Sequence, residues 1–367
     1  MQFPDGEHGA GIRSESLSGV AALSDAAVNE RVLYTSVSVQ GEPIAVSGII
    51  ALPRTPAPEG GYPVVSWTHG TLGSADKCAP SRDTADSAAH PFNVAPQPML
   101  NALLRQGYAV VMTDYEGLGT PGPHPYLLGE SEARGALDIV RAARQLHPVI
   151  SDQLAIVGHS QGGQAALFAA HYAPSWTPEL SLKTVVAQAP ANHIALGFQT
   201  SLLSPNPDEG YAFDPLFING AVGGDPSIDP ERFLTADAYR LYLRDTESRC
   251  RIELSEPDSW GGIKGTDIVR LDAVTGPDYR KFITQLEATQ PALSIQAPIR
   301  LVQDEEDKRV SPIGTALLNQ ELRAINAPDR VTYVSYPQVA SSPLGAHFGL
   351  LTTDTEPLTD WLRAHFE

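Results

Sequence analysis

One ten-residue stretch indicates most strongly how this chain folds: residues 154–163 read Leu-Ala-Ile-Val-Gly-His-Ser-Gln-Gly-Gly. Its first four residues form an apolar run of the kind that a strand buried on both faces requires. The next residues, Gln-Ala-Ala-Leu at 164–167, continue as a helix, and the pattern G-x-S-x-G lies between the two. The stretch therefore predicts a strand, a sharp turn with the Ser160 hydroxyl group exposed on it, and a helix.

Short apolar runs alternate with amphipathic stretches on both sides of this motif. Alternation of this kind predicts a mostly parallel, doubly wound sheet with helices on both faces, which is the architecture of the α/β-hydrolase fold. We predict parallel strands over 63–67, 108–113, 154–158, 184–189, 299–303 and 331–336. The predicted helices cover 99–106, 130–146, 162–171, 314–324 and 358–366.

The N-terminal part of the chain has a different pattern. Residues 31–40 alternate apolar and polar side chains, Gly-Glu-Pro at 41–43 reads as a turn, and 44–52 is a second apolar run. We predict an antiparallel hairpin there. Residues 1–30 are predicted to form a helical lead-in.

A long segment interrupts the alternation of strands and helices. Residues 192–291 contain no convincing parallel strand, are rich in Pro, Gly and Asp, and include helix-like pieces at 230–244 and 277–287. We predict that this segment is an inserted, mainly helical cap, and that residues 1–191 and 292–367 form the core domain. Long insertions of this sort are usually functional.

The chain is acidic, with 43 Asp and Glu against 25 Lys and Arg and a formal net charge of −18 over 367 residues. Such a surface repels phosphate backbones and anionic headgroups, so we expect a small neutral or apolar substrate rather than nucleic acid. The alternative is that the acidity only keeps the protein soluble. No apolar run approaches the ~18 residues that span a bilayer, so we expect no stable membrane insertion.

The chain contains two cysteines, Cys78 and Cys250. They form no metal-ligand cluster, so the sequence predicts no zinc site. Either the two pair with each other or both are free. Each lies in a polar, loop-like stretch, which favours pairing.

The G-x-S-x-G motif points to a serine nucleophile, and this fold orders its catalytic residues as Ser, then Asp or Glu, then His. Asp307 lies in a carboxylate-rich loop after the strand 299–303, three residues before Val-Ser-Pro, and is our candidate acid; Asp304 in the same loop is the alternative. His347, on a loop ahead of the last helix, is the candidate base, and His365 is its rival. We expect His159, beside the nucleophile, to be structural.

An oxyanion hole needs backbone N–H groups near the nucleophile. We predict that Gln161 supplies one, since it opens the helix after Ser160, and that Thr71 supplies the other. Thr71 follows His69 and Gly70 at the end of the first parallel strand. Gly70 lets the backbone approach the substrate, and His69 orders the loop.

The predicted cap contains several large apolar side chains that are candidates for lining a substrate pocket. As substrate-contacting residues we predict His69 and Gly70 from the core and, from the cap, Phe213, Phe217, Tyr239 and Trp260. Each cap aromatic has the alternative of being plain cap core.

Three segments together resemble the secretory-lipase (fungal lipase A-like) family of α/β-hydrolases. They are Ser-Trp-Thr-His-Gly-Thr at 66–71 leading to Cys-Ala-Pro-Ser at 78–81, Asp-Tyr-Glu-Gly-Leu-Gly at 114–119, and Gly-His-Ser-Gln-Gly-Gly at 158–163, the last in a bacterial-looking form. The resemblance implies a lid-like helical cap, ester hydrolysis and no cofactor. It also implies secretion, whereas residues 1–13 show no signal peptide, so a cytoplasmic location stays open.

The predicted activity is serine-dependent hydrolysis of neutral or apolar carboxylic esters, as an esterase, lipase or lactonase acting through an acyl-enzyme. The alternatives are an acyltransferase with the same triad, a peptidase, and a non-catalytic binding protein on a hydrolase scaffold. A dinucleotide site at the Gly-rich residues 220–224 is disfavoured, because no strand precedes them in a βαβ unit.

Overall fold

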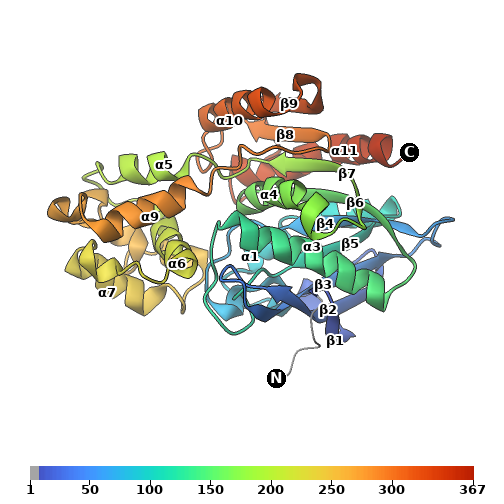
Figure 1. Cartoon of the computed structure of the whole chain (residues 1–367), viewed down its shortest axis with the longest axis horizontal. Coiled ribbons are helices and arrows are strands. Elements are labelled where there is room, and N and C mark those ends of the chain that lie inside the picture. Colours follow the sequence, from blue (N-terminus) through green and yellow to red (C-terminus); the bar gives the residue numbers. More distant parts are fainter. Residues whose placement is uncertain (1–7) are drawn as a thin grey trace.

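The computed structural model describes residues 8–367, and its centre is a sheet of nine strands (Figure 1). The strands lie in the order β1-β2-β3-β5-β4-β6-β7-β8-β9. The pairs β1–β2, β2–β3 and β3–β5 are antiparallel, and all the others are parallel. The predicted mostly parallel sheet with an antiparallel hairpin is therefore confirmed. The strands are β1 (Gly11–Ser16), β2 (Ala26–Val37), β3 (Pro43–Pro53), β4 (Tyr62–Thr68), β5 (Ala109–Thr113), β6 (Ile150–His159), β7 (Ser181–Gln188), β8 (Ile299–Asp304) and β9 (Val331–Tyr336).

Helices cover both faces of the sheet. On one face, α3 (Gly129–Leu146), α4 (Gln161–Trp176) and α10 (Pro312–Ile325) contribute to one apolar cluster, and on the other, α2 (Gln97–Arg105) and α11 (Ala346–Phe366) contribute to a second. The short helix α1 (His90–Val94) precedes α2. This is the doubly wound layering that the alternating pattern predicts.

The apolar runs form strands because both of their faces are buried. In β5, Ala109 and Val111 belong to one apolar cluster, while Val110 and Met112 belong to the cluster on the other side. A strand with a polar face would expose every second residue, and here all five residues of β5 are buried. The carboxyl ends of these strands point to one edge of the sheet, where the loops that carry the candidate residues lie.

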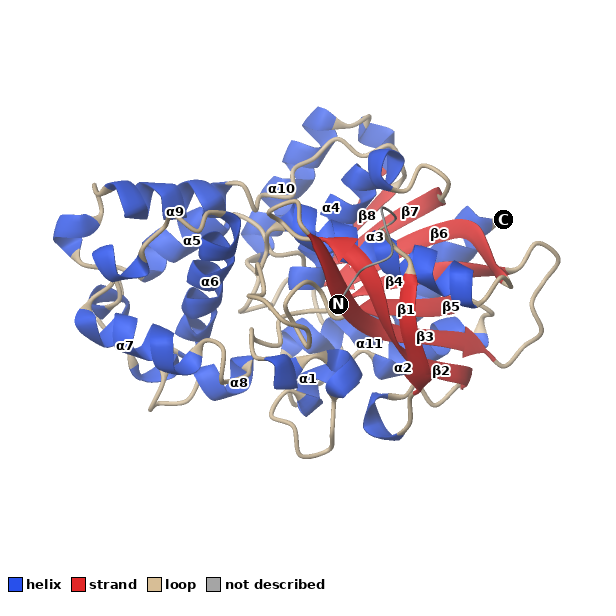
Figure 2. Cartoon of the chain, turned by 60° about the horizontal axis from the view of Figure 1, so that its bottom comes forward, coloured by secondary structure: helices blue, strands red, loops and turns tan. Residues whose placement is uncertain are grey.

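The inserted segment contains helices and no named strand (Figure 2). Its helices gather at the end of the molecule away from the sheet and share an apolar cluster of their own that includes Phe198, Phe233, Trp260 and Phe282. The helices are α5 (Ile194–Ser201), α6 (Asp214–Gly224), α7 (Ala236–Asp245), α8 (Arg251–Leu254) and α9 (Pro277–Glu287).

A disulfide bond joins this helical segment to the core. Cys78 and Cys250 are bonded across a sequence separation of 172 residues, and both are fully buried in a small apolar cluster. The residues beside the bond also pair, because Gly73 and Cys250 form an isolated antiparallel bridge. The sequence leaves open whether the two cysteines pair or are both free, and in the structure they pair.

Replacing both Cys78 and Cys250 with alanine is expected to lower the free energy of unfolding by about 2–5 kcal/mol, because a crosslink between such distant residues restricts the unfolded chain. Denaturant unfolding of the wild type and the double variant measures this change. Reducing agent during unfolding should lower the wild-type midpoint and leave that of the variant unmoved. Equal stability of both proteins under oxidising conditions would contradict the expectation.

Two predictions of secondary structure are wrong. Within residues 8–30 the predicted helical lead-in over 1–30 is not observed: the chain forms β1 from Gly11, one 3-10 turn at Gly19–Ala21 and, from Ala26, the start of β2. Residues 1–7 lie outside the described residues. Strand β1 forms because it pairs with β2 along its whole length. The terminal helix starts at Ala346, not at 358, so His347 lies in its first turn and Pro357 lies inside it.

Within the described part of the chain, no helix combines the length and the apolar character that crossing a membrane takes.

Candidate active site

Ser160 occupies the turn between β6 and α4 in a strained backbone conformation. Its φ of 60° and ψ of −122° lie in a region that side chains other than glycine rarely adopt. The turn is tight because the backbones on either side almost touch: a Cβ at Gly158 would lie 2.0 Å from the Gly162 carbonyl oxygen, and one at Gly162 would lie 1.8 Å from that of Thr68. The two glycines of the motif are therefore required by packing, and they project the Ser160 side chain from the end of the sheet.

His347 and Asp307 form a buried pair. The Nδ1 atom of His347 lies 2.6 Å from Oδ2 of Asp307, and both side chains are almost inaccessible. Burial opposes ionisation of Asp307, but its hydrogen bond with His347 and the charge of that ring outweigh burial and lower its pKa. The other carboxylate oxygen, Oδ1, accepts the backbone N–H groups of Arg309 and Val310. The pair therefore consists of an ionised carboxylate and an imidazole whose Nδ1 carries the shared proton.

The rival residues make other contacts. Oδ1 of Asp304 accepts the Glu306 N–H at 3.0 Å, as a turn cap does. His365 lies near the end of α11, where its Nδ1 donates to the Trp361 carbonyl oxygen. Neither residue is hydrogen-bonded to His347, so geometry favours Asp307 and His347 as the acid and base.

His159 is structural, as expected. It is buried, and its Nε2 donates to the backbone carbonyl oxygen of His347 at 2.9 Å. Burial, reinforced by the charge of His347, lowers the pKa of His159 well below its ordinary value, so the ring is neutral. A neutral His159 thus supports the position of the candidate base without competing for its proton.

The two candidate oxyanion donors lie at either side of Ser160. Gln161 is the first residue of α4, and Thr71 lines the same pocket as Ser160. Among residues 8–367, neither backbone N–H donates to another group of the protein. The Thr71 hydroxyl, a possible third donor, is 2.6 Å from the Tyr126 hydroxyl and is engaged there. Both N–H groups are therefore available to an oxyanion.

A buried polar network lies under this side of the site. The Gln161 side chain donates to Oε1 of Glu132 at 2.7 Å, and the Leu127 N–H donates to the same oxygen. Burial raises the pKa of Glu132 to about 8, although these two hydrogen bonds oppose the rise. His124 is also within 3.3 Å of the Gln161 amide, and burial lowers its pKa to about 4. At neutral pH the network is therefore uncharged and fixes the first turn of α4.

Replacing Glu132 with glutamine is expected to remove a pH dependence of stability. Between pH about 4.5 and about 8 the folded wild type holds a proton on Glu132 that the unfolded chain has lost, so its unfolding free energy falls as pH rises. One proton contributes up to about 1.4 kcal/mol per pH unit. Urea unfolding at pH 5 and pH 7.5 should show a smaller decrease for the variant; parallel decreases would rule out this role.

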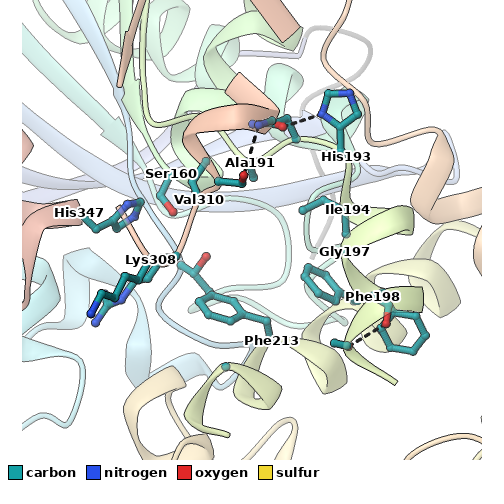
Figure 3. Close-up of a pocket in the computed structure, with 18 of the residues that line it drawn as sticks. Ser160, Ala191, His193, Ile194, Gly197, Phe198, Phe213, Lys308, Val310 and His347 are labelled. Carbon is teal, nitrogen blue, oxygen red and sulfur yellow. Dashed lines mark hydrogen bonds between the residues drawn. The ribbon is translucent and has the colours of Figure 1, made fainter. Parts of the chain in front are cut away.

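The candidate nucleophile, the candidate base and Thr71 all line one large pocket (Figure 3). Its volume is about 1430 Å³, and Thr71, Ser160 and His347 line it together with residues of the helical segment. Figure 3 shows Ser160 and His347 next to each other on the pocket wall, with Phe213 entering from the helical segment. The apolar part of the lining includes Ile194, Leu196, Phe198, Phe213, Phe217, Ile313 and Leu317.

The predicted substrate-contacting residues divide into two groups. Phe213 and Phe217 line the pocket, but Tyr239 and Trp260 do not; Trp260 is fully buried in the core of the helical segment, and Tyr239 stacks on Tyr242. Tyr239 and Trp260 therefore contribute to the apolar core of the helical segment, which is the alternative given above for the cap aromatics.

The loop at 69–70 lies under the site. His69 is buried, its carbonyl oxygen accepts the Tyr115 hydroxyl, and burial lowers its pKa to about 4. A Cβ at Gly70 would lie 3.4 Å from that of Ser160. Both residues line a small pocket behind the large one, so they shape the loop without facing the main pocket.

Sequence reasoning missed Tyr126, Glu132, Arg251 and Arg309 as neighbours of the site. Arg309 lies in the same loop as the candidate acid Asp307, and Tyr126 lies in the long loop between β5 and α3. A search of the loops that follow the strands for polar side chains would find both. Glu132 has no such signal, since an acidic residue in the first turn of a helix is ordinarily exposed.

The comparisons with known proteins agree with this picture. Residues 93–200 match the model of the secretory lipase family, so the predicted resemblance is confirmed over that range. Lipase A of Moesziomyces aphidis is 26% identical over 47% of this chain and 37% of its own length. A protein of Mycobacterium tuberculosis named a probable inactive lipase is 24% identical over 51% of this chain and 42% of its own. The chain thus aligns with less than half the length of these curated relatives.

Solved structures with this fold align over most of the chain. Candida antarctica lipase A in its closed state has a TM-score of 0.73 at 21% identity, covering 90% of this chain and 77% of its own. The rice cell wall degrading esterase LipA of Xanthomonas oryzae has a TM-score of 0.77 at 19% identity, covering 96% and 97%. The α/β-hydrolase fold predicted from the motif is therefore confirmed.

Proposed function

We propose that this protein is a carboxylic-ester hydrolase that works through an acyl-enzyme, with Ser160 as nucleophile, His347 as general base and Asp307 as the residue that orients and stabilises the imidazolium ion. The observation that carries the proposal is that the strained Ser160 turn and His347 line one pocket, with His347 hydrogen-bonded at 2.6 Å to the buried Asp307. Such a combination matches what serine-dependent acyl transfer requires.

The hydrogen bond to Asp307 holds the Nδ1 proton of His347 and leaves Nε2 free to accept a proton. When the Ser160 oxygen attacks the ester carbonyl carbon, Nε2 takes the hydroxyl proton, and the carbonyl oxygen becomes an oxyanion. The N–H groups of Thr71 and Gln161 stabilise it. Collapse expels the alcohol with the proton from His347, and a water activated by the same ring then releases the acid.

The helical segment 192–291 would serve as a cap that shapes the substrate pocket. Its residues Ile194, Phe198, Phe213 and Phe217 contribute apolar surface to a cavity of about 1430 Å³. That volume exceeds the roughly 300–1,000 Å³ of ordinary ligand pockets, which supports a bulky or long substrate with an apolar body. Linear esters and lactones fit this description equally.

The alternative is a non-catalytic protein on a hydrolase scaffold, since one relative is named a probable inactive lipase. Loss of function on such a scaffold usually removes a member of the triad, whereas here all three candidates are present and two are hydrogen-bonded. An acyltransferase would use the same residues and differ only in excluding water.

Hydrolysis of a p-nitrophenyl ester series from acetate to palmitate tests the proposal, together with covalent labelling by a fluorophosphonate. We expect hydrolysis of at least part of the series, a chain-length optimum that reflects the pocket, and the label on Ser160 in a peptide map. A protein that hydrolyses neither esters nor lactones and takes no label would favour the non-catalytic alternative. Acyl transfer to an added alcohol in preference to water would indicate the transferase.

A further inference from the structure

Arg251 is held beside the candidate oxyanion loop by two separate connections. It follows Cys250, which is bonded to Cys78 of the core. Its backbone N–H donates to the Leu72 carbonyl oxygen at 2.7 Å, one residue after Thr71. The backbone of this part of the helical segment is therefore fixed next to the site.

The Arg251 side chain is buried and has no acidic partner. Its exposed fraction is 5%, and it lines the pocket that contains Ser160 and His347. Its Cζ atom lies 4.8 Å from the centroid of the Phe213 ring and 5.7 Å from that of Phe92. Among residues 8–367 the side chain makes no hydrogen bond or ion pair, and its Nε is buried without a partner. The ring contacts leave the N–H donors unused.

Arg309 provides a second guanidinium group on the same pocket. Its Cζ lies 5.7 Å from the centroid of the Phe92 ring, on which Arg251 also packs, and 5.2 Å from that of Phe348. Burial and the positive charge of Arg309 lower the pKa of Arg251 to about 10, so Arg251 remains a cation at neutral pH. Burial also lowers the pKa of Arg309, whose guanidinium group ordinarily stays charged. The described part of the chain offers Arg309 no ion-pair partner within 4.0 Å either.

The two cations pack on the same Phe92 ring and repel each other, and an anion bound by both would offset that repulsion. The acidic residue that attracts both is Glu209, which is exposed and forms no ion pair with either. Asp307 also attracts Arg309, but its carboxylate is hydrogen-bonded to His347. Other carboxyl groups on the pocket wall belong to Asp208, Asp214 and Glu306. Burial raises the pKa of Asp214 well above its ordinary value, so it supplies no counter-charge.

We propose that Arg251 and Arg309 form a subsite for a carboxylate group of the substrate, so that the preferred esters carry an anionic group in addition to an apolar body. Planar guanidinium groups with free N–H donors bind carboxylates in two-point geometry. The inference rests on the proposed ester hydrolysis. It revises the expectation of a neutral substrate, because that expectation used the net charge of the whole chain and the pocket has its own local charges.

The test compares kcat/KM for two matched pairs of esters. In the first pair the carboxylate is on the acyl side: monomethyl adipate against methyl hexanoate. In the second it is on the alcohol side: 4-acetoxybutanoate against butyl acetate. For Arg251→Met we expect the ratio of kcat/KM for the anionic ester to kcat/KM for the neutral ester to fall about 10- to 100-fold relative to wild type in one pair. The pair that is affected shows whether the subsite binds the acyl side or the alcohol side of the substrate. A ratio unchanged in both pairs overturns the proposal.

Two control variants separate recognition from structure. Arg251→Lys keeps the charge and should retain more of the ratio than Arg251→Met. Arg240→Met removes an exposed arginine of α7, paired with Asp237, and should leave the ratio as in the wild type. If Arg251 only packs the helical segment on the core, Arg251→Met will lower the melting temperature and slow both members of each pair alike.

Binding of adipate distinguishes failure of this proposal from failure of ester hydrolysis. By titration calorimetry we expect the wild type to bind adipate at least 10-fold more tightly than Arg251→Met, whether or not esters are cleaved. An active hydrolase that binds adipate no better than the variant contradicts the carboxylate subsite alone. A protein that binds adipate and cleaves no ester contradicts the hydrolase and keeps the subsite.

Discussion

Replacing Ser160 with alanine is expected to lower kcat for ester hydrolysis by about 10⁵- to 10⁶-fold, because the proposed acylation has no nucleophile without the hydroxyl oxygen. The fold should tolerate the change. Alanine keeps the Cβ atom and the same backbone restrictions, and among the described residues the Ser160 hydroxyl makes no hydrogen bond. Steady-state kinetics on the best p-nitrophenyl ester and a thermal melt measure the two effects.

The matched control for that variant is Ser175→Ala. Ser175 is exposed on the last turn of the same helix, α4, and its hydroxyl donates only to the Tyr172 carbonyl oxygen. This control should keep wild-type activity. If Ser160→Ala keeps more than a tenth of the wild-type kcat in a preparation free of other esterases, Ser160 is not the nucleophile.

Replacing Asp307 with asparagine is expected to lower kcat by about 10⁴-fold, because it should select the wrong histidine tautomer. The backbone N–H groups of Arg309 and Val310 donate to Oδ1, so the asparagine carbonyl oxygen should occupy that position. The asparagine NH₂ group then faces Nδ1 of His347 and donates to it. The ring proton moves to Nε2, which no longer accepts the proton of Ser160.

The matched control here is Asp304→Asn. Asp304 is the last residue of β8, three residues before Asp307. Its Oδ1 accepts a backbone N–H and, among the described residues, its Oδ2 has no partner, so an asparagine can preserve the turn. We expect a change of kcat within a few-fold. A loss as large as that of Asp307→Asn would mean that the two carboxylates share the task, and rapid-quench measurement of acylation would show which step each affects.

The strands of the parallel sheet could be predicted because burial on both faces leaves a continuous apolar run, as at 109–113. The antiparallel edge of the sheet was harder to predict from the sequence. Strand β1 reads Gly-Ile-Arg-Ser-Glu-Ser and is half-exposed, so its hydrogen bonds to β2, which are invisible in a local pattern, decide its conformation. At the other end, Pro357 normally marks a helix start, yet contacts of Leu350, Leu351, Leu358 and Leu362 with the core stabilise one helix across it.

The candidate triad could be predicted because each member follows a strand of the core, where order along the chain determines position in space. Which residues form the pocket wall could not be predicted from the sequence. Phe213 and Trp260 are both large and apolar, but which one faces the cavity depends on how the helical segment packs on itself. Arg251 is brought to the site by a bond between residues 172 positions apart, and no local pattern contains that information.

The Cys78–Cys250 bond also has a mechanical consequence. An inserted segment joined to its parent domain only by its two chain ends can rotate as a rigid body about those two connections. Here a covalent third attachment lies inside the segment, away from both ends. We expect this third attachment to restrict large-amplitude movement of the whole segment while the bond is intact. If the segment is the proposed cap, we expect substrates to enter by local movement of the pocket rim rather than by displacement of the whole segment. Reduction of one buried bond would then change access to the pocket without altering any reacting atom.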